Sequence, residues 1–455
     1  MEKVSKNKVL FVIMLTSFLT PFTSSALTLS LPSMGQDFGA AASELGWVLE
    51  IFLLASIVSL LPMGHLADQL GKRRVLLLGA ALFTAASLAA AFAPNLAALL
   101  TLRCLQGFGA AMMFATNLSI LALVFPKEER GRAMGWNVAL IYVGLALGPV
   151  IGGLLNYYLG WRSIFFVIAF VGAVGVLSIH FFLRQEWREA ARASHDFIGA
   201  ALYGCAVVLT MYGVSELMKV SCAAGALFSG LALFAAFLWR ERRLDAPLFP
   251  LRLFAESRAF SLSTLAALLN YCATFAMSFL LSIYLQSVLG ISSREAGLLL
   301  LLQPVIMAAF SPRMGRLSDR YPPARIASIG MGIIAVGLFA LAAIVHLRLT
   351  LPVVPAIALV GAGFACFAAP NNNAIMSAVP KRDYSLASSM LVTARHVGQV
   401  LSVALVTALL SVDWGISSAG DTLARNITIA FLVMAVLCLV GIAPSAARCQ
   451  NTNRR

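Results

Sequence analysis

A small number of charged side chains stand inside long apolar stretches of this sequence, where a charge can bind a proton or an ion. Glu50 lies in the run LGWVLEIFLLAS, and Arg103 lies in LLTLRCLQGFG. A charge at the centre of a bilayer costs at least about 2.5–3.5 kcal/mol, so each such residue needs a physical reason. The two residues lie at comparable depths in their apolar runs, which makes an ion pair between them feasible. A carboxyl group held between burial and a guanidinium can bind a proton in one state and release it in another. We therefore predict that Glu50 carries a proton, with a structural ion pair as the alternative.

Polar residues also fall near the middle of other apolar runs, mostly in the second half of the chain. They are Asn117, Tyr142, Asn270, Tyr271, Gln303, Arg395, His396 and Gln399. We expect this set to line a shared cavity, although an interhelical hydrogen bond worth about 0.6 kcal/mol explains any single amide equally well. His396 either titrates near neutral pH or is a packing residue. Arg395 needs an anion, which is either Glu50 or an acidic group on a bound molecule.

The elements that hold these side chains are predicted to be membrane-spanning helices. The chain has 455 residues, of which 60% are hydrophobic and 11% are charged, whereas a soluble domain is about half apolar and a quarter charged. A helix needs roughly 20 apolar residues to cross a bilayer. Runs of this length begin near fourteen positions: 9, 45, 74, 96, 133, 162, 197, 220, 258, 295, 325, 350, 385 and 425. The sequence therefore predicts an all-α, polytopic membrane protein with fourteen transmembrane helices.

The basic residues predict how these helices are oriented. The formal net charge is +14, from 33 Lys and Arg against 19 Asp and Glu. With the N-terminus in the cytoplasm, 26 of the 33 fall in inside segments, five in outside segments and two within spans, which is the bias of the positive-inside rule. We expect a multi-pass protein of the plasma membrane, the inner membrane of a bacterium, with both termini in the cytoplasm. Because topology accounts for the charge, nothing points to a nucleic-acid surface.

Two motifs occur twice along the chain at a nearly constant step. GHLADQLGKRR begins at Gly64, and its weaker copy GRLSDRYPPAR begins at Gly315, 251 residues later. FPKEERGRAMGWNVALIYVG at 125–144 aligns with VPKRDYSLASSMLVTARHVG at 379–398, at a step of 254 residues. Such internal repeats are common in transporters, whose substrate site lies between the halves near the midplane.

The repeat predicts how the chain divides. We expect two six-helix bundles, residues 1–183 and 258–455, joined by residues 184–257. The longest polar stretches, at 184–196 and 240–258, enclose two further apolar runs. The joining segment is therefore predicted to insert two extra transmembrane helices.

Several motifs resemble those of the major facilitator superfamily, and the resemblance extends over essentially the whole chain. The stretch from Gly64 to Arg74 resembles the family's loop between helices 2 and 3, and RCLQGFGAA at 103–111 is similar to its helix-4 motif. YLQSVLGISSREAGLLLLLQP at 284–304 is similar to the start of the second half in the fourteen-helix drug:proton antiporters. GLALGPVIGG resembles the family's antiporter signature, with Gly144, Gly148, Pro149, Gly152 and Gly153.

The resemblance implies a gate at the cytoplasmic face. In the family, the loop between helices 2 and 3 ties the halves together and releases them in the inward-open state. The matching residues here are Gly64, Asp68, Gly71, Arg73 and Arg74, with Asp319 in the second copy. We favour Asp68 as a latch, while the cations are equally consistent with a solvated basic loop. We expect a reduced role for the second copy, because YPPAR replaces its basic end.

The resemblance also implies a direction of transport. The glycines of the antiporter signature allow another helix to pack closely, Pro149 bends the helix, and in the family this motif accompanies export. The implied function is a proton-coupled secondary exporter of lipophilic or cationic small molecules, of the multidrug type, working by alternating access. The alternative is an exporter of a specific anionic metabolite or lipid, with Arg395 and Arg103 as anion contacts. Thr23 stands where the family carries an acid in helix 1, so either Glu50 has that role or the coupling differs.

Other classes of function have weak support in the sequence. The five His residues are scattered, and the seven Cys residues show no metal-ligand spacing, so we expect no metal, no cofactor and no enzyme activity. The sequence contains no nucleotide-binding motif of the form GxxxxGK[ST], so the energy must come from an ion or substrate gradient. The expected partners are a small-molecule substrate, protons and the lipid bilayer, and we expect a monomer.

Overall fold

The structure, a computed structural model, describes residues 5–28, 30–40, 42–188, 196–216, 223–244, 249, 251–410, 412 and 419–448. These described residues form helices and loops and contain no β-strand. Thirteen of the described helices are long and apolar enough to cross a membrane, and Ile198–Gly213 is a further, shorter apolar helix. The fourteen segments match the predicted spans, and the protein is an all-α, polytopic membrane protein.

The first six long helices form an N-terminal bundle. They are α1 (Lys6–Thr28), α3 (Ala42–Leu70), α4 (Lys72–Ala90), α5 (Leu96–Val124), α6 (Lys127–Leu159) and α7 (Arg162–Phe182). The short helix α2 (Leu31–Phe38) connects α1 to α3. Within the bundle, α5 packs against α3 and α4, α6 against α1, and α7 against α4. Fully buried apolar side chains such as Ile13, Phe52 and Phe83 make up its core.

The last six spans form a C-terminal bundle. They are α11 (Arg258–Thr274) with α12 (Met277–Ile283) and the π-helical turn Tyr284–Val288, then α13 (Ser293–Arg320), α14 (Pro323–His346), α15 (Val353–Ser377), α16 (Tyr384–Leu410) and α17 (Ala419–Ala447). A single 3-10 turn, Lys381–Asp383, precedes α16. Here α14 packs against α15 and α17, and α11 against α16 and α17. The fold is therefore that of two six-helix bundles, as the sequence repeat predicted.

Polar residues mark where some of these helices begin. Asn95 accepts a hydrogen bond (2.9 Å) from the backbone N–H of Ala98 at the start of α5. Ser292 and Glu295 form a reciprocal capping box at the start of α13. A cap of this kind satisfies backbone N–H groups that have no partner inside the helix and is worth about 0.5–2 kcal/mol. The caps fix the ends from which the spans carry their polar side chains into the bundles.

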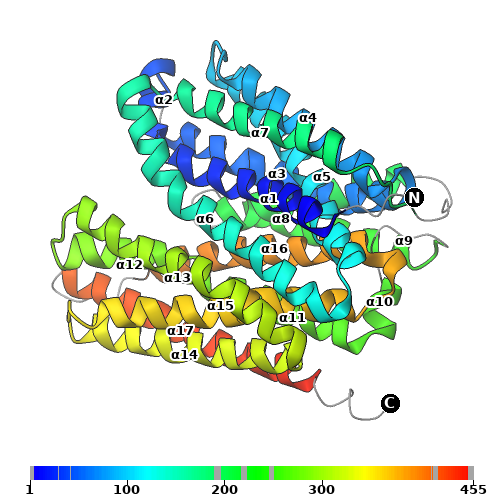
Figure 1. Ribbon diagram of the computed structural model, residues 1–455. Helices are drawn as coiled ribbons and strands as arrows, with labels where there is room; N and C mark the ends of the chain where they lie inside the picture. Colours follow the sequence, from blue (N-terminus) through cyan, green and yellow to red (C-terminus); the bar gives the residue numbers. More distant parts are fainter. Residues whose placement is uncertain are drawn as a thin grey trace.

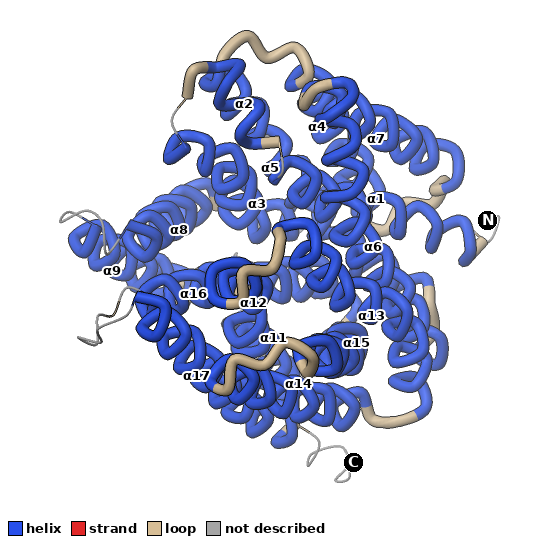
Figure 2. Tube along the Cα trace, turned by 90° about the vertical axis from the view of Figure 1, so that its left-hand side faces the viewer, coloured by secondary structure: helices blue, strands red, loops and turns tan. Residues whose placement is uncertain are grey.

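A two-helix hairpin is inserted between the bundles. It consists of α8 (Phe197–Glu216) and α9 (Ala223–Glu241), and the short helix α10 (Leu251–Glu256) leads from it to α11. Besides its partner α9, α8 packs against α3 and α16. Figure 2 shows α8 beside these two helices, with α9 farther from the rest of the molecule. The insertion therefore lies along the line where α3 of the N-terminal bundle meets α16 of the C-terminal bundle, which we call the α3–α16 seam.

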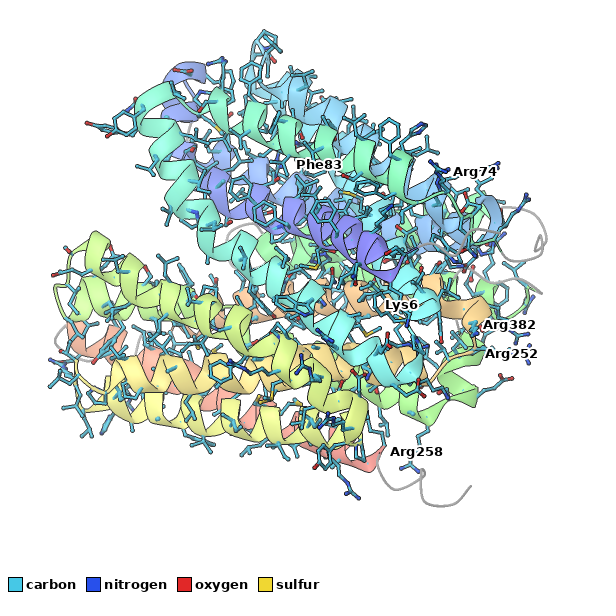
Figure 3. All side chains as sticks on the ribbon, in the orientation of Figure 1. Lys6, Arg74, Phe83, Arg252, Arg258 and Arg382 are labelled. Carbon is cyan, nitrogen blue, oxygen red and sulfur yellow. The ribbon has the colours of Figure 1, made fainter. Side chains whose placement is uncertain are left out.

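The two bundles approach each other at one end of the molecule. In Figure 1 the N-terminal bundle lies above the C-terminal bundle, and their helices converge towards the right and diverge towards the left. Figure 3 labels Lys6, Arg74, Arg252, Arg258 and Arg382 towards the converging end. We call it the basic end, because the connections between helices there carry most of the Lys and Arg residues.

Candidate functional site

The first copy of the repeated motif brings α3 against α16. A Cβ added at Gly64 would clash with the hydroxyl of Ser389 and lie 3.2 Å from the carbonyl oxygen of Ser385. Next to this contact, the hydroxyl of Ser388 donates a hydrogen bond (2.8 Å) to the carbonyl oxygen of Phe114 on α5. A side chain at position 64 would displace the hydroxyl of Ser389 and crowd the carbonyl oxygen of Ser385, so α3 and α16 approach each other closely here.

The second copy makes the corresponding contact between α13 and α6. A Cβ added at Gly315 would clash with the carbonyl oxygen of Gly131 and lie 2.8 Å from the Cα of Gly135. These two glycines stand 254 residues before Ser385 and Ser389, the partners of the first copy. The same contact between bundles thus occurs twice, and both occurrences lie at the basic end.

The charged groups of the first copy bind their own bundle. Lys72 Nζ lies 2.7 Å from Asp68 Oδ1, and both side chains are almost completely buried. Gly71 between them has a φ of 109°, a conformation that glycine adopts at little cost. The backbone N–H of Lys72 donates a hydrogen bond (2.9 Å) to the carbonyl oxygen of Trp187, in the segment after α7. The loop from α3 to α4 is therefore locked to the start of the connection between the bundles.

Two further cations of this copy bind the same connecting segment. The backbone N–H of Arg73 donates to Glu186 Oε1 (2.9 Å), and its side-chain Nε donates to the carbonyl oxygen of Leu183. Arg74 is exposed, with its Nε 3.8 Å from Glu186 Oε2. Arg73 has a defined structural partner, whereas Arg74 fits the alternative of a solvated topology charge.

Asp319, in the second copy, bonds to the opposite bundle. Its Oδ1 accepts a hydrogen bond from the backbone N–H of Gly131 (2.6 Å), and its Oδ2 accepts one from that of Arg132 (2.9 Å). Both N–H groups lie near the start of α6, where the helix dipole favours a negative charge. The reduced role that we expected for the second copy stays a prediction, and the geometry gives this copy two hydrogen bonds from one bundle to the other. Asp68 makes its described ion pair within its own loop, and Asp319 joins α13 to α6.

A charged cavity adjoins this contact. Its volume is ≈ 350 Å³, and it is lined by Glu128, Glu129, Arg132, Arg316, Asp319 and Arg320. Close by, the guanidinium of Arg130 lies 5.4 Å from the ring centre of Tyr384 at the start of α16. Tyr384 stands 254 residues after Arg130, so two counterparts of the repeat meet each other at the basic end. The sequence analysis missed this pair, although the alignment of the two motifs already places these positions opposite each other.

The antiporter signature packs against α1. Its residues Gly144, Gly148, Pro149, Gly152 and Gly153 all lie within α6. A Cβ added at Gly144 would lie 2.9 Å from the carbonyl oxygen of Phe18, and one added at Gly148 would lie 2.9 Å from the backbone nitrogen of Ala26. Side chains of any size would push the two helices apart. The signature thus sets the packing of α6 on α1 within the N-terminal bundle.

The predicted pair of Glu50 and Arg103 does not form in this structure. Arg103 is fully buried, and its Nε donates to the carbonyl oxygen of Val48 (2.8 Å) while Nη1 donates to Gln106 Oε1 (2.8 Å). Its guanidinium also lies 4.4 Å from the ring centre of Phe52. Val48 and Phe52 are buried on the face of α3 towards α5, whereas Glu50 is exposed and stands about 200° around the helix from either. Arg103 reaches α3 at the level of Glu50, as we expected, but the depth of a residue in its helix does not determine the face on which it lies.

Glu50 lies on a face of α3 that is not buried against α5. Ile57 is seven residues later and shares this face. Its carbonyl oxygen accepts a hydrogen bond (3.2 Å) from the hydroxyl of Tyr203 on α8. The carboxyl group of Glu50 is thus an exposed acid within a span of the N-terminal bundle.

Arg395 and three aromatic residues come together between the bundles, and we call these four residues the aromatic site. The half-buried Arg395 places its guanidinium 5.0 Å from the ring centre of Tyr271. Phe364 packs edge to face with Tyr271, at 5.4 Å between ring centres, and with Tyr142, at 6.0 Å. Tyr142 belongs to α6 of the N-terminal bundle, and the other three belong to α11, α15 and α16 of the C-terminal bundle. Phe364 was not predicted, because its sequence context does not distinguish it from other phenylalanines that face lipid or core.

Two more predicted residues adjoin the aromatic site. Nδ1 of His396 lies 2.9 Å from Oε1 of Gln399, and the imidazole packs against the ring of Phe114 on α5, with 6.1 Å between ring centres. One helical turn nearer the basic end, residues from both bundles form a small apolar cluster of Leu60, Ala111 and Val392. On α16 this cluster lies between Arg395 of the aromatic site and Ser388 and Ser389 at the basic end.

Three further residues predicted to line the cavity are buried, and Asn117 lies within a single bundle. Asn117 accepts a hydrogen bond from the hydroxyl of Thr16 (3.1 Å) and donates one to that of Ser17 (2.9 Å), which joins α5 to α1. Asn270 is 0% exposed, and Gln303 is buried on α13, where its backbone approaches α15. Asn117 therefore matches the alternative of an interhelical hydrogen bond. We predicted these residues from their depth in the span, but the role of each depends on the face of the helix on which it lies.

Two bundles related by an internal repeat, with a polar and aromatic site between them, define the architecture of a secondary membrane transporter. The sequence matches the Major Facilitator Superfamily over residues 13–258 and 263–449, and the chain belongs to this family. Its members transport small molecules and are not enzymes.

Named relatives and a solved structure are similar over nearly the whole chain. The riboflavin transporter RibZ of Clostridioides difficile (strain 630) is 28% identical over 442 residues, which cover 95% of each chain. The multidrug resistance protein Stp of Mycobacterium tuberculosis (strain CDC 1551 / Oshkosh) is 31% identical over 391 residues, which cover 85% of this chain and 72% of Stp. The crystal structure of the human organic anion transporter MFSD10 has a TM-score of 0.70, with 97% of this chain and 99% of that chain covered at 15% identity. This last likeness shows the fold.

Proposed function

We propose that the protein exports flat aromatic small molecules, neutral or anionic, by alternating access driven by protons. The observation that carries the proposal is the aromatic site, where Arg395 lies over the ring of Tyr271 beside Phe364 and Tyr142. Aromatic rings bind planar partners by stacking and edge contacts worth about 0.5–1.5 kcal/mol each beyond burial. Because both bundles contribute to the site, rocking of one bundle against the other changes its contacts, as alternating access requires.

The charge of the aromatic site selects among the substrate classes that the sequence suggested. Arg395 would repel a cationic compound and attract a carboxylate or a polarised carbonyl oxygen. We therefore favour neutral or anionic compounds over the lipophilic cations of the first interpretation. Arg103 does not serve as the second anion contact, because its guanidinium is fully buried on Val48 and Gln106 inside the N-terminal bundle.

The relatives support an aromatic substrate class without naming a compound. RibZ is described as a riboflavin transporter, and Stp as a multidrug resistance protein. Riboflavin is a planar polycyclic molecule, which fits a site built from three aromatic rings. RibZ, at 28% identity, supports an aromatic class of compound. Stp, at 31% identity, supports export of drugs, as do the glycines of α6 through the family's antiporter signature.

We propose Glu50 as the group that exchanges the proton. It is an acid within a membrane span, where acids are functional by default because of their cost. Its exposed carboxyl can reach water or a partner in ways that a sealed core residue cannot. It would take the role of the helix-1 acid, whose position holds the buried Thr23.

The placement in the cell follows from charge and family. The basic end is proposed to face the cytoplasm, since loops rich in Lys and Arg remain on that side. We place the protein in the inner membrane of a bacterium, with both termini in the cytoplasm, as a monomer among the fourteen-helix antiporters. Converging bundles at the basic end then correspond to a state that is closed towards the cytoplasm.

The substrate class is tested by binding measurements on the purified protein. Three planar fluorophores of similar size, one anionic, one neutral and one cationic, are titrated against the wild type and Arg395→Gln. We expect Arg395→Gln to weaken binding of the anionic probe about tenfold or more, because a hydrogen bond to a charged group is worth about 1.5–3 kcal/mol. Binding of the neutral probe should change little.

Arg325→Gln is the matched control, since Arg325 is exposed at the start of α14 and loses the same charge. It should leave all three affinities unchanged. Equal binding of the anionic probe by the wild type and Arg395→Gln, or a preference of the wild type for the cationic probe, would contradict the proposed substrate class.

A further inference from the structure

The inserted hairpin is attached to the N-terminal bundle through α8. The hydroxyl of Tyr203 donates a hydrogen bond (3.2 Å) to the carbonyl oxygen of Ile57 on α3. One residue later, a Cβ added at Gly204 would lie 3.1 Å from the side chain of Val58. Tyr203 is only 2% exposed, so this is a packed contact and not a surface encounter. Figure 2 shows α8 in this position, beside α3 and α16.

A continuous row of aromatic rings leads from this attachment to the C-terminal bundle. The ring centres of Tyr203 and Phe237 are 5.6 Å apart, and those of Phe237 and Phe249 are 6.3 Å apart. Phe249 stacks on Phe254 at 5.5 Å, and Phe254 packs edge-on against Phe260 at 5.0 Å. Phe260 is fully buried in α11, the first helix of the C-terminal bundle. The row therefore joins α8, α9, the connecting segment and α11 in one series of contacts.

Polar contacts hold the row at its base. Arg240 near the end of α9 pairs with Asp196 before α8, and Asp196 Oδ1 also accepts a hydrogen bond (2.9 Å) from the backbone N–H of Gly199. Glu241 is 1% exposed, and its Oε2 accepts a hydrogen bond (2.9 Å) from the backbone N–H of Phe249. These bonds close the base of the hairpin and fix the backbone of the central ring of the row.

We propose that the inserted hairpin is a strap that holds the two bundles together along the α3–α16 seam and limits opening at the basic end. On one side the hairpin is attached to α3 through the hydrogen bond of Tyr203, and on the other it is attached to the C-terminal bundle, through the packing of α8 on α16 and through Phe260 on α11. When the bundles separate at the basic end, these two attachments are pulled apart, and at least one ring contact must break. The strap therefore favours the state in which the basic end is closed.

The strap is tested by measuring the separation of the bundles directly. Spin labels are placed at Leu70, the end of α3, and at Arg382, just before α16, in a background in which the native cysteines are replaced. Distances between the labels are then measured by pulsed electron resonance for Phe249→Ala and Tyr203→Phe. We expect Phe249→Ala to raise the ratio of long to short distances about tenfold, which corresponds to about 1.4 kcal/mol. Tyr203→Phe, which keeps the ring and loses the hydrogen bond, should shift the ratio in the same direction by less.

Phe228→Ala is the matched control, because Phe228 lies on the same hairpin in α9 but is 71% exposed. It should leave the distances unchanged. The proposal is overturned if folded Phe249→Ala keeps the wild-type distances, or if Phe228→Ala shifts them equally. Should Phe249→Ala fail to fold, unchanged distances in Tyr203→Phe overturn it alone. The measurement needs no transported compound, so its outcome does not depend on the proposed substrate class.

Discussion

At the residue scale, two aspartates at equivalent positions of the repeat perform different tasks. Asp68 neutralises Lys72 inside its own loop, whereas Asp319 accepts two backbone hydrogen bonds from α6 of the other bundle. An aspartate that is paired with a lysine one turn away stabilises the local loop. An aspartate on the N–H groups of an opposing helix stabilises one arrangement of the bundles. Of the contacts described, those of Asp319, in the copy with the weaker sequence match, cross from one bundle to the other.

This difference predicts separate effects for the two Asp→Asn substitutions. Asp319→Asn should raise the open population at the basic end about tenfold or more, since hydrogen bonds to a charged group are worth about 1.5–3 kcal/mol. Asp68→Asn should instead lower the free energy of unfolding by about 3–5 kcal/mol, because it leaves the buried Lys72 without its carboxylate partner. Label distances between Leu70 and Arg382 and thermal unfolding of each variant measure the two effects. If the basic end opens in Asp68→Asn but not in Asp319→Asn, then Asp68, and not Asp319, is the residue that holds the bundles together.

The sequence identified several of these residues but not their partners. Arg395 and Tyr271 were predicted as cavity residues, and the structure brings them together. Glu50 and Arg103 were predicted as a pair from their depth, but Arg103, on α5, contacts the face of α3 that carries Val48 and Phe52, and Glu50 lies on a different face of α3. Depth follows from counting residues along an apolar run. The face depends on where α5 and α8 pack, which a single sequence does not contain.

At the element scale, a short helix fastens the end of the molecule opposite the basic end. Oδ2 of Asp37, on α2, accepts hydrogen bonds from Trp161 Nε1 (2.8 Å) and Arg162 Nη1 (2.6 Å). The hydrogen bond from Trp161, and after it the one from Arg162, lowers the pKa of Asp37 below its ordinary value of 3.8. These bonds tie α2 to the start of α7 and so set how the chain passes from α1 to α3.

The lowered pKa of Asp37 predicts a pH-dependent stability. Because the pKa is lower in the folded than in the unfolded protein, the stabilisation is complete above about pH 4 and is lost as the pH falls through the folded value. Asp37→Asn should therefore lower the free energy of unfolding near neutral pH by about 0.2–1 kcal/mol, as expected for an exposed pair. The difference from the wild type should be smaller at pH 3, because part of the stabilisation is lost once the pH falls below the unfolded pKa of 3.8. Thermal unfolding at both pH values measures it.

Glu128→Gln removes an exposed carboxyl at the basic end and serves as the control for this series. The difference in the free energy of unfolding between Glu128→Gln and the wild type should not change between neutral and acid pH as it does for Asp37→Asn. A stability difference between Asp37→Asn and the wild type that is as large at pH 3 as at pH 7 would show that the carboxylate charge is not what binds Trp161 and Arg162.

The elements were largely predictable, because their determinants are local. A run of about 20 apolar residues spans the bilayer as a helix, because a helix satisfies its own backbone hydrogen bonds in lipid. The fourteen helices were predicted to begin close to the residues at which they are observed to begin. Gly144 and Gly148 predicted a tightly packed helix, which proved to be α1. The short helix α2 and the π-helical turn Tyr284–Val288 were not predicted, because neither carries a periodic pattern long enough to recognise.

At the scale of the whole molecule, the internal repeat explains how the bundles meet. The steps of 251 and 254 residues place Gly64 opposite Ser385 and Ser389, and Gly315 opposite Gly131 and Gly135. One bundle can then rotate against the other about paired contacts of the same kind. The inserted hairpin breaks this symmetry, since its α8 packs along the α3–α16 seam. A repeat is visible in a sequence, but the seam that an insertion covers is visible only in three dimensions.

We propose that protonation of Glu50 drives the outward movement of an aromatic compound through the aromatic site. The most direct test is uptake or release of the anionic fluorophore by proteoliposomes with and without an imposed pH gradient, for the wild type and Glu50→Gln. Glu44→Gln is the matched control, an exposed acid in the first turn of the same helix. We predict that Glu50→Gln abolishes movement driven by the gradient but retains exchange of labelled for unlabelled compound, and that Glu44→Gln behaves as the wild type. Gradient-driven transport at the wild-type rate in Glu50→Gln would contradict the role of Glu50 in proton coupling.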